Sequence, residues 1–344
     1  MASLTSLASV ECDSLYFTGP GQVAVKTEPI QPPSTGQLLI RTHLSAISPG
    51  TERLILRGQV ASDLALDESI AGLDGSFKYP FKYGYAAIGQ VIKVGANVST
   101  DWQDRWVFAF HPHESHFLTT PDHVIPLPEG VTVADAVFLP NVETAVNLIL
   151  DGSPLLGENI IVFGQGIVGL LTTTLLAQFP LNSLTTVDTQ PSRQQQSRDA
   201  GADQSFTPSQ VTDWVSEQTF DKADLIYELS GNPAALDQAV ALTGFGGRIV
   251  VGSWYGTKPA TLDLGSHFHR GRQRIISSQV STIAPELLGR WQKKRRIDLA
   301  WRKLQQIKPS RFISHRFPID QAAQAYKLLD QEAADVMQIV LTYT

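Results

Sequence analysis

Apolar residues in the middle of the chain fall into alternating runs of two kinds. Residues 160–163 are all apolar, as in a buried strand, and they lead directly into the sequence GQGIVG at residues 164–169. Leucines then recur at helical spacing over residues 170–176, and a second apolar run at residues 183–187 ends in Asp188. This pattern predicts a strand, a glycine turn, a helix and a second strand, which is the order of a parallel α/β unit.

The alternation of strands and helices continues beyond Asp188. Residues 223–228 and 247–252 predict two more buried strands, and residues 193–200 and 233–242 predict helices. Ligands of open α/β sheets bind where strands end, so the residues after these strands should border a ligand. They are Ser230, Gly231, Val251, Gly252 and Ser253, with Trp254 and Tyr255 following. For Trp254 and Tyr255, packing and substrate contact both stay open.

The first part of the chain has a different pattern. Residues 15–47 contain short apolar runs separated by glycine and proline, which predicts antiparallel strands of a β-rich domain. The sequence SPGTE at residues 48–52 predicts a turn that opens a short helix. An apolar run at residues 106–110 predicts a buried strand, and the histidine-rich sequence HPHESH follows at residues 111–116.

Composition narrows the class of protein. A chain of 344 residues suggests two domains, and a formal charge of -6 gives no indication of nucleic acid or a membrane surface as partner. The single cysteine, Cys12, excludes an intrachain disulfide and a cysteine-rich zinc site. The sequence shows neither a signal peptide nor a membrane span, so we expect a soluble, cytoplasmic protein.

The glycine turn has the spacing of a dinucleotide-binding site. Gly164 suits a tight turn, Gly166 allows the backbone to approach a pyrophosphate, and Gly169 allows close packing of helix and strand. The helix that begins at Ile167 and Val168 offers free N–H groups and its positive dipole end to phosphate. Asp188, nineteen residues past Gly169, stands where an acid bonds the adenosine ribose and favours NAD over NADP. Arg193 could soften this preference, and a purely structural glycine turn is the alternative.

The order of these regions resembles the medium-chain dehydrogenase/reductase superfamily over essentially the whole chain. Within it, SPGTE at residues 48–52, Gly84-Tyr85 and NVETA at residues 141–145 are most similar to relatives of hydroxyethyl bacteriochlorophyllide dehydrogenase, many of them named zinc-type alcohol dehydrogenases. The resemblance implies an α/β fold: a GroES-like catalytic domain (1–150), a Rossmann NAD-binding domain with a doubly wound parallel sheet (151–290), and a return to the catalytic domain (291–344). It also implies a homodimer.

The residues at the zinc-ligand positions of the superfamily are not zinc ligands here. The matching positions hold Ser48 with Pro49, then Tyr85 between Gly84 and Ala86, then Pro140 with Asn141. Zinc needs thiolate, imidazole or carboxylate donors. We therefore expect a zinc-independent protein. His111, His113 and His116 are close enough in sequence to chelate a metal, against the alternative of a polar pocket rim or structural histidines.

Without a metal, the proton of an alcohol must pass to a positioned side chain. Tyr85 takes the place of a zinc ligand, and the resemblance assigns substrate-oxygen contact to Thr51, with Glu52 and His43 as onward relays. His111 or His113 is a second candidate relay, and Tyr85 as mere filling of the vacated metal volume is the alternative. The resemblance also places Thr144 beside the nicotinamide. The expected substrate pocket comprises Ser48, Phe110, His113, Asn141, Trp254, Tyr255 and Arg270.

Positive charge is concentrated in residues 270–303, which contain ten Lys or Arg and two acidic residues. Arg270, Arg272 and Arg274 are candidates for binding carboxylate or phosphate groups of substrate or cofactor, because Arg forks suit such anions. For residues 293–296 a solvated helix face is the favoured interpretation.

These features predict an NAD(H)-dependent, zinc-free oxidoreductase that interconverts a secondary alcohol and a ketone or aldehyde. A carboxylate-bearing or cyclic, tetrapyrrole-like small molecule is one option for the substrate. Two alternatives stay open: an NAD(P)H-dependent reductase of activated C=C bonds in enones or quinones, and a non-catalytic dinucleotide-binding protein.

Overall fold

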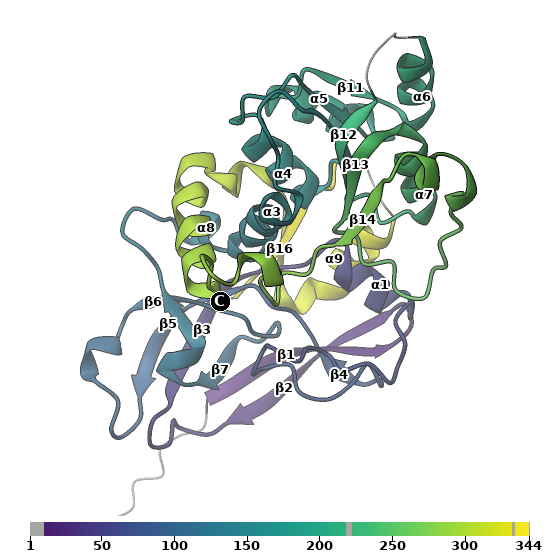
Figure 1. Cartoon of the computed structure of the whole chain (residues 1–344). Helices are drawn as coiled ribbons and strands as arrows, with labels where there is room; N and C mark the ends of the chain where they lie inside the picture. Colours follow the sequence, from purple (N-terminus) through teal and green to yellow (C-terminus); the bar gives the residue numbers. More distant parts are fainter. Residues whose placement is uncertain (1–9, 218–221, 332–333, 344) are drawn as a thin grey trace, which may run out of the picture. The chain divides into compact units, whose positions relative to one another are not determined.

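A computed structural model describes residues 10–217, 222–331 and 334–343. The chain divides into two compact units, the first formed by the described residues up to Phe138 and from Lys308 onward, the second by Leu139–Ile307 (Figure 1). The boundaries expected from the sequence, after residues 150 and 290, differ from these. The reason is that α3 (Leu139–Gly152) and α8 (Lys293–Ile307) pack side by side in the second unit.

The second unit contains a six-stranded sheet in which each neighbouring pair is parallel. Its spatial order is β11-β10-β9-β12-β13-β14, the order of a dinucleotide-binding sheet with two halves that meet at β9 and β12. The strands are β9 (Asn159–Phe163), β10 (Ser183–Val187), β11 (Gln204–Phe206), β12 (Ala223–Glu228), β13 (Thr243–Val251) and β14 (Arg274–Ser277). The predicted doubly wound α/β fold is confirmed.

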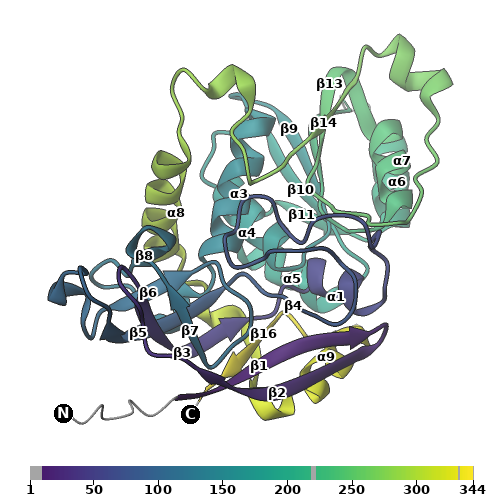
Figure 2. The ribbon, with the colours of Figure 1, turned by 90° about the horizontal axis from the view of Figure 1, so that it is seen from below.

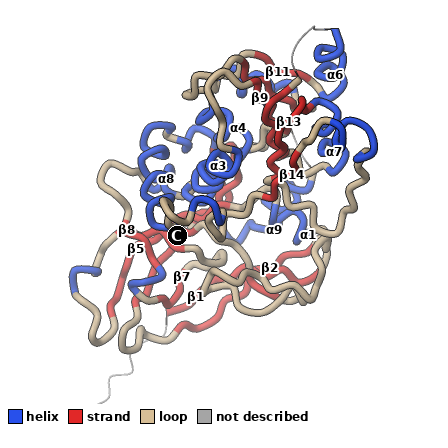
Figure 3. Tube along the Cα trace, viewed as in Figure 1, coloured by secondary structure: helices blue, strands red, loops and turns tan. Residues whose placement is uncertain are grey.

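Helices cover both faces of this sheet, and the sequence of β9 shows why. Ile160 and Val162 point to one face and pack with residues of α3 and α4, whereas Ile161 and Phe163 point to the other and pack with residues of α6 and α7. Figure 3 shows the red strands of this unit running between blue helices. The helices besides α3 and α8 are α4 (Ile167–Leu176), α5 (Pro191–Asp199), α6 (Pro208–Glu217) and α7 (Pro233–Leu242).

The first unit is built from two β-sheets, a three-stranded one of order β2-β1-β4 and a seven-stranded one of order β15-β16-β3-β5-β6-β8, with β7 paired to β3. The strands from the end of the chain join the larger sheet, because β16 pairs antiparallel with β3. The strands are β1 (Val10–Gly19), β2 (Gln22–Ile30), β3 (Leu38–Ala46), β4 (Phe81–Lys82), β5 (Ala87–Val94), β6 (Trp106–Ala109), β7 (His116–Thr119), β8 (Val124–Pro126), β15 (Ile313–Pro318) and β16 (Gln338–Thr342).

An aromatic core joins the two ends of the chain within the first unit. Phe17 of β1 stacks on Phe81 at 5.7 Å between ring centroids, and Tyr326 meets Phe17 edge-on at 5.3 Å. Tyr326 lies on α9 (Ala322–Asp330), which packs beside the long β1–β2 hairpin (Figure 2). The remaining helices of this unit are α1 (Thr51–Leu56) and α2 (Val133–Ala136).

Across the part of the chain that the structure describes, no helix has the length and apolar character needed to cross a membrane.

Candidate functional site

The glycine turn between β9 and α4 forms an open cradle. A Cβ atom on Gly169 would lie 1.8 Å from the backbone oxygen of Gly164, and one on Gly164, whose φ is +84°, would lie 2.6 Å from the oxygen of Leu229. A Cβ on Gly166 would instead meet nothing within 4 Å. Gly164 and Gly169 therefore serve packing, and Gly166 leaves the backbone open to a ligand. Ile167 and Val168 begin α4, so their N–H groups belong to the helix end that attracts phosphate.

Asp188 lies directly beside this turn. Its Oδ2 accepts the N–H of Gln165 at 2.7 Å, and its Oδ1 accepts the N–H of Gln190 at 2.9 Å. The side chain is buried, as expected for an acid held at the carboxyl end of β10. Arg193 lies half-buried on the following helix, α5. The cradle and the adjacent acid fit the pyrophosphate and ribose of a dinucleotide.

The loops after β12 and β13 are held together by hydrogen bonds. The N–H of Gly231 donates to Ser253 Oγ at 2.9 Å, and Lys258 Nζ donates to the Gly231 carbonyl at 2.5 Å. Glu228, the last residue of β12, is fully buried and accepts the Tyr255 hydroxyl at 2.5 Å, as well as the hydroxyl of Ser230. Sequence reasoning missed Glu228, although an acid that ends an apolar strand was a visible signal.

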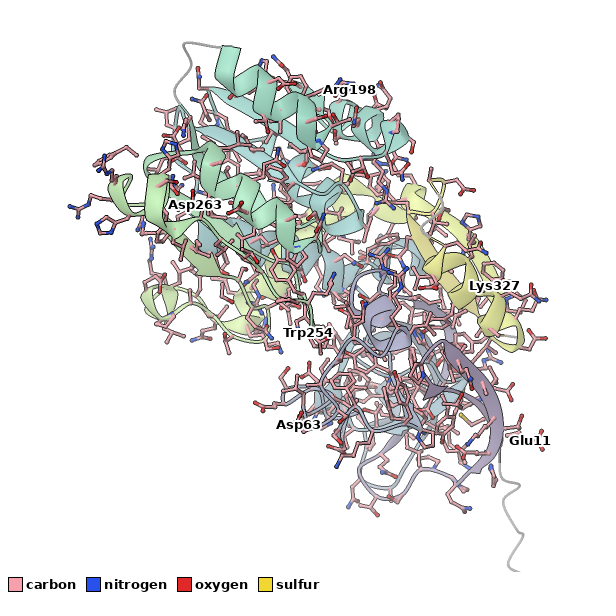
Figure 4. All side chains as sticks on the ribbon, turned by 90° about the vertical axis from the view of Figure 1, so that its right-hand side faces the viewer. Glu11, Asp63, Arg198, Trp254, Asp263 and Lys327 are labelled. Carbon is pink, nitrogen blue, oxygen red and sulfur yellow. The ribbon has the colours of Figure 1, made fainter. Side chains whose placement is uncertain are left out.

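The structure places several of the expected site residues in this part of the second unit. Tyr255, a candidate for substrate contact, uses its hydroxyl to hold Glu228, while Trp254, labelled in Figure 4, is 40% exposed. Gly252 packs against Leu229 and Leu148, where a Cβ would come within 2.7 Å of each. The Thr144 hydroxyl donates to the Pro140 carbonyl at 2.8 Å within α3, and Asn141 of the same helix is buried.

In the first unit, Tyr85 and Ser48 form a close pair of hydroxyl groups. The Tyr85 hydroxyl donates to Ser48 Oγ at 2.5 Å. Both side chains are half-buried. Burial raises the pKa of the Tyr85 phenol, and the nearby Glu52 carboxylate adds to the rise, while hydrogen bonds with Ser48 and Thr51 oppose it. Tyr85 therefore keeps its proton at neutral pH.

Glu52 holds the turn that carries Ser48. Its Oε1 accepts the Ser48 N–H at 2.7 Å, and the Glu52 N–H donates to the Ser48 carbonyl at 3.0 Å, so the two residues are joined by two hydrogen bonds. The Glu52 side chain is fully buried, and its Oε2 also accepts the Tyr326 hydroxyl. The carboxylate therefore orients Ser48 toward Tyr85.

A chain of buried polar groups continues from Glu52. His113 Nε2 lies 3.1 Å from Glu52 Oε2, and Nδ1 lies 2.6 Å from Ser45 Oγ, which in turn lies 2.7 Å from the Tyr343 hydroxyl. A Cβ on Gly84 would lie 2.8 Å from the His113 ring. His113 was expected in the substrate pocket, but it has no exposed surface. It instead packs against Gly84, the residue that precedes Tyr85, inside the unit.

His111, an expected catalytic residue, belongs to a different group of side chains. Its Nε2 lies 2.7 Å from Glu114 Oε2, and its ring stacks on Phe117 at 3.8 Å. Lys82 and Ser14 donate to Glu114 Oε1 at 2.6 and 2.7 Å. Burial alone would raise the pKa of Glu114, but His111 and Lys82 outweigh it and bring the pKa to about 2. The geometry joins His111 to an ion-pair cluster rather than to Tyr85.

The remaining histidines and Phe110 take separate positions. His43, expected as a relay, is exposed and packs edge-on against Trp106 at 5.4 Å. His116 Nδ1 lies 3.2 Å from Ser115 Oγ, and Phe110 packs edge-on against Phe108 at 4.9 Å. Within the described ranges, no three His, Cys, Asp or Glu side chains are grouped as a metal site.

In the basic segment 270–303, the exposed and buried side chains are not all the ones that the sequence interpretation expected. Arg270, Arg272 and Arg274 are exposed at the edge of the parallel sheet, whereas Gln273 between them is buried and donates to the Val240 and Thr243 carbonyls. The interpretation of residues 293–296 as a solvated face is wrong for Arg296, which is fully buried against Glu143. Adjacent basic residues point in different directions on a helix, and the sequence did not show which one faces α3.

Comparison with known proteins agrees with this architecture. Residues 168–292 match the family model of zinc-binding dehydrogenases. The chain is 22% identical to the starvation-sensing protein RspB of Escherichia coli, over 96% of this chain and 99% of that protein.

Two solved structures have the same fold. One, described as the short chain alcohol dehydrogenase rspB from E. coli CFT073 in complex with NADH, has a TM-score of 0.77 at 21% identity and covers 97% of this chain and 100% of that one. The other, 2R,3R-butanediol dehydrogenase from Bacillus subtilis, has a TM-score of 0.78 at 15% identity and covers 96% and 99%.

Gly169→Ala and Gly166→Ala are expected to affect different properties, the first stability and the second cofactor binding. The first places a methyl group against the Gly164 carbonyl and should lower the free energy of unfolding by about 1–3 kcal/mol. The second meets open space and should leave stability within about 0.5 kcal/mol, but it should weaken NADH binding because it fills the cradle. Urea denaturation and NADH titration measure the two effects, and equal stability of both variants would contradict the packing role of Gly169.

Proposed function

Because the chain belongs to the medium-chain dehydrogenase/reductase superfamily, we propose that it is an oxidoreductase that uses NAD(H), without zinc, to interconvert an alcohol and the corresponding ketone or aldehyde. The open cradle at Gly166, with Asp188 beside it, is the observation that supports dinucleotide binding. A small-molecule substrate follows from this reaction class, and the homodimer stays a prediction.

The observation that carries the proposal is the hydroxyl pair of Tyr85 and Ser48, 2.5 Å apart at a half-buried position. Glu52 fixes the Ser48 backbone, and His113 packs beneath Gly84, so the pair is held from two sides. A substrate oxygen that hydrogen-bonds with this pair would face both a donor and an acceptor. Such preorganised donors are what carbonyl and alkoxide oxygens require for catalysis.

The dinucleotide, when bound, supplies or accepts the hydride. The task of this chain is then to move the proton of the substrate oxygen. Because its pKa is raised, Tyr85 holds its proton, which hydrogen-bonds to Ser48 Oγ. When a substrate oxygen takes the place of Ser48 Oγ as acceptor, Tyr85 can donate this proton to the oxygen that becomes negative as a carbonyl is reduced. An alkoxide is a much stronger base than a phenolate, so the transfer is favourable even from a phenol of raised pKa. Ser48 and Thr51 orient the phenol through their hydrogen bonds.

A catalytic zinc ion does not fit the residues of this site. By the resemblance to zinc-dependent members of the superfamily, Ser48, Pro49 and Tyr85 stand at two of the ligand positions, and Pro140 and Asn141 stand at the third. Neutral hydroxyl and amide groups are poor zinc ligands compared with thiolate, imidazole or carboxylate. The nearest carboxylate and imidazole, Glu52 and His113, are fully buried and bonded to each other. In the proposed mechanism, Tyr85 therefore takes the place of a zinc ion in polarising the substrate oxygen.

Tyr85→Phe should lower kcat for carbonyl reduction by about 100-fold or more, because general acids typically contribute 10²–10⁴-fold. In the wild type the rate should stay constant through neutral pH and fall only above pH 10, the ordinary pKa of tyrosine, since Tyr85 must keep its proton. The variant should lack this fall. Steady-state kinetics over a range of pH, with a panel of ketones and aldehydes, measures both effects.

The matched control is Tyr83→Phe, two residues away in the aromatic core, with 5.8 Å between the centroids of its ring and the Phe77 ring. It should keep the wild-type rate and pH profile. A mild effect of Tyr85→Phe together with reduction of enones would favour a reductase of C=C bonds. NADH binding without turnover of any compound in a broad panel would favour a non-catalytic role.

The purified protein is expected to contain no stoichiometric zinc, and chelators should leave both activity and melting temperature unchanged. The physical reason is the lack of charged or imidazole donors at the ligand positions. Elemental analysis tests the first expectation, and kinetics with thermal denaturation tests the second. A content of about one zinc per chain, lost together with activity on chelation, would overturn the zinc-free mechanism.

NADH should bind more tightly than NADPH, because the Asp188 carboxylate bonds a ribose diol and repels a 2′-phosphate. Asp188→Asn should reduce the preference by about tenfold or more, as expected for a charge-assisted hydrogen bond. Fluorescence titration of both reduced cofactors measures this, with Asp203→Asn as control, since Asp203 follows the next helix and bonds the Leu184 N–H. Tighter binding of NADPH by the wild type would contradict the assignment.

A further inference from the structure

Arg296 of α8 is the largest fully buried side chain among the described residues. All five of its N–H donors are used. Nε and one Nη2 hydrogen reach Glu143 Oε1 of α3 at 3.0 and 2.9 Å, and Nη1 donates to Asn147 Oδ1 at 2.5 Å. The other two hydrogens go to backbone carbonyls, from Nη1 to Thr282 at 2.8 Å and from Nη2 to Val280. The guanidinium thus ties the segment 278–282 to α3 and α8.

The same segment is also held at its start. Ser278 Oγ donates to Asp151 Oδ2 of α3 at 2.6 Å, and Asn147 Nδ2 donates to Ser278 Oγ at 3.1 Å. The Ser278 N–H donates to the Val251 carbonyl at the end of β13 at 3.0 Å. The conformation of residues 278–282 is therefore set by polar contacts from three elements.

Residues 278–282 follow β14, at the carboxyl edge of the parallel sheet where ligands bind. Of the two halves of this sheet, the one with β9, β10 and β11 carries the glycine turn and Asp188. It therefore takes the adenosine part of a dinucleotide. The half with β12, β13 and β14 is left for the nicotinamide part.

Stability alone does not explain the Arg296 network. A buried ion pair can usually be replaced by apolar residues of similar volume without loss of stability, because removing the charges from water offsets their attraction. The two preceding basic residues, Lys294 and Arg295, are exposed, so the helix has no general requirement for burying positive charge. Unlike apolar residues, Arg296 makes directional hydrogen bonds with the Val280 and Thr282 carbonyls.

We propose that Arg296, supported by Glu143 and Asn147, is a positioning residue for the nicotinamide half of the cofactor site, which it serves by holding the segment 278–282. This rests on the proposed function, since it assumes that the sheet binds NAD(H). The guanidinium touches neither cofactor nor substrate in this role. It acts through the backbone of the segment.

The experiment compares the binding of NADH with that of AMP, which carries only the adenosine half. The double variant Arg296→Met/Glu143→Leu removes both charges and so leaves no unpaired ion in the core. NADH should bind about tenfold more weakly to it, because the segment must now be ordered on binding. AMP should bind as it does to the wild type. Calorimetric titration with each ligand gives both numbers, and steady-state kinetics should show a raised KM for NADH.

Two further variants complete the test. Lys294→Gln, on the exposed side of the same helix, should leave NADH and AMP binding unchanged. Ser278→Ala removes the two hydrogen bonds of the Ser278 hydroxyl with little change in volume and leaves the Arg296 contacts in place. It should weaken NADH binding selectively but less strongly, which keeps the test possible should the double variant not fold.

The inference is overturned if NADH and AMP binding change equally, or if NADH binding is unchanged in a variant with a wild-type melting profile. A wild-type protein that binds neither ligand would instead refute the proposed function.

Discussion

A carboxylate removed from water must be given hydrogen-bond donors, and this constraint organises the functional parts of both units. Glu52, Glu228, Glu143 and Asp188 are all buried, and each lies on an element beside a candidate site. Because protein groups must supply the donors, three of these carboxylates hold a turn or loop, at Ser48, Ser230 and Gln165, and the fourth, Glu143, holds Arg296 of helix α8. The rigid geometry of these turns follows from the cost of leaving a buried charge unsatisfied.

The groups that donate hydrogen bonds to each carboxylate determine how that carboxylate affects its neighbours. Glu52 receives hydrogen bonds from neutral groups, with His113 beside it, and it adds to the rise in the pKa of Tyr85 that burial mainly causes. Glu143 receives a guanidinium, which spreads the contact over several carbonyls and so holds a whole segment. Glu114 has Lys82 and His111 as partners, which bring its pKa to about 2 and make it a permanent anion above strongly acid pH. The same residue type thus tunes a phenol, orders a loop or anchors an ion-pair cluster.

Prediction succeeded for the parts of the fold that depend on local pattern. The glycine turn, its strand and helix, and Asp188 were identified from spacing, because tight turns and buried parallel strands restrict residue type strongly within a short stretch. Ser48, Thr51, Glu52 and Tyr85 were recognised through a resemblance, and the structure brings these four together. Prediction failed where a residue's surroundings depend on distant parts of the chain. His113, His111 and Arg296 are polar residues in polar sequence contexts, and nothing local distinguishes a buried histidine or arginine from an exposed one.

By itself the sequence determined the α/β fold and the position of the glycine turn between β9 and α4. These features depend on residue type, period and short-range spacing, which a linear pattern carries in full. The tertiary structure alone decided that His113 is buried against Gly84 and Glu52, that His111 pairs with Glu114, and that Arg296 turns inward to meet Glu143, 153 residues away. The physical reason is that burial of a polar side chain depends on partners supplied by other elements, and those partners are brought together only when the chain folds.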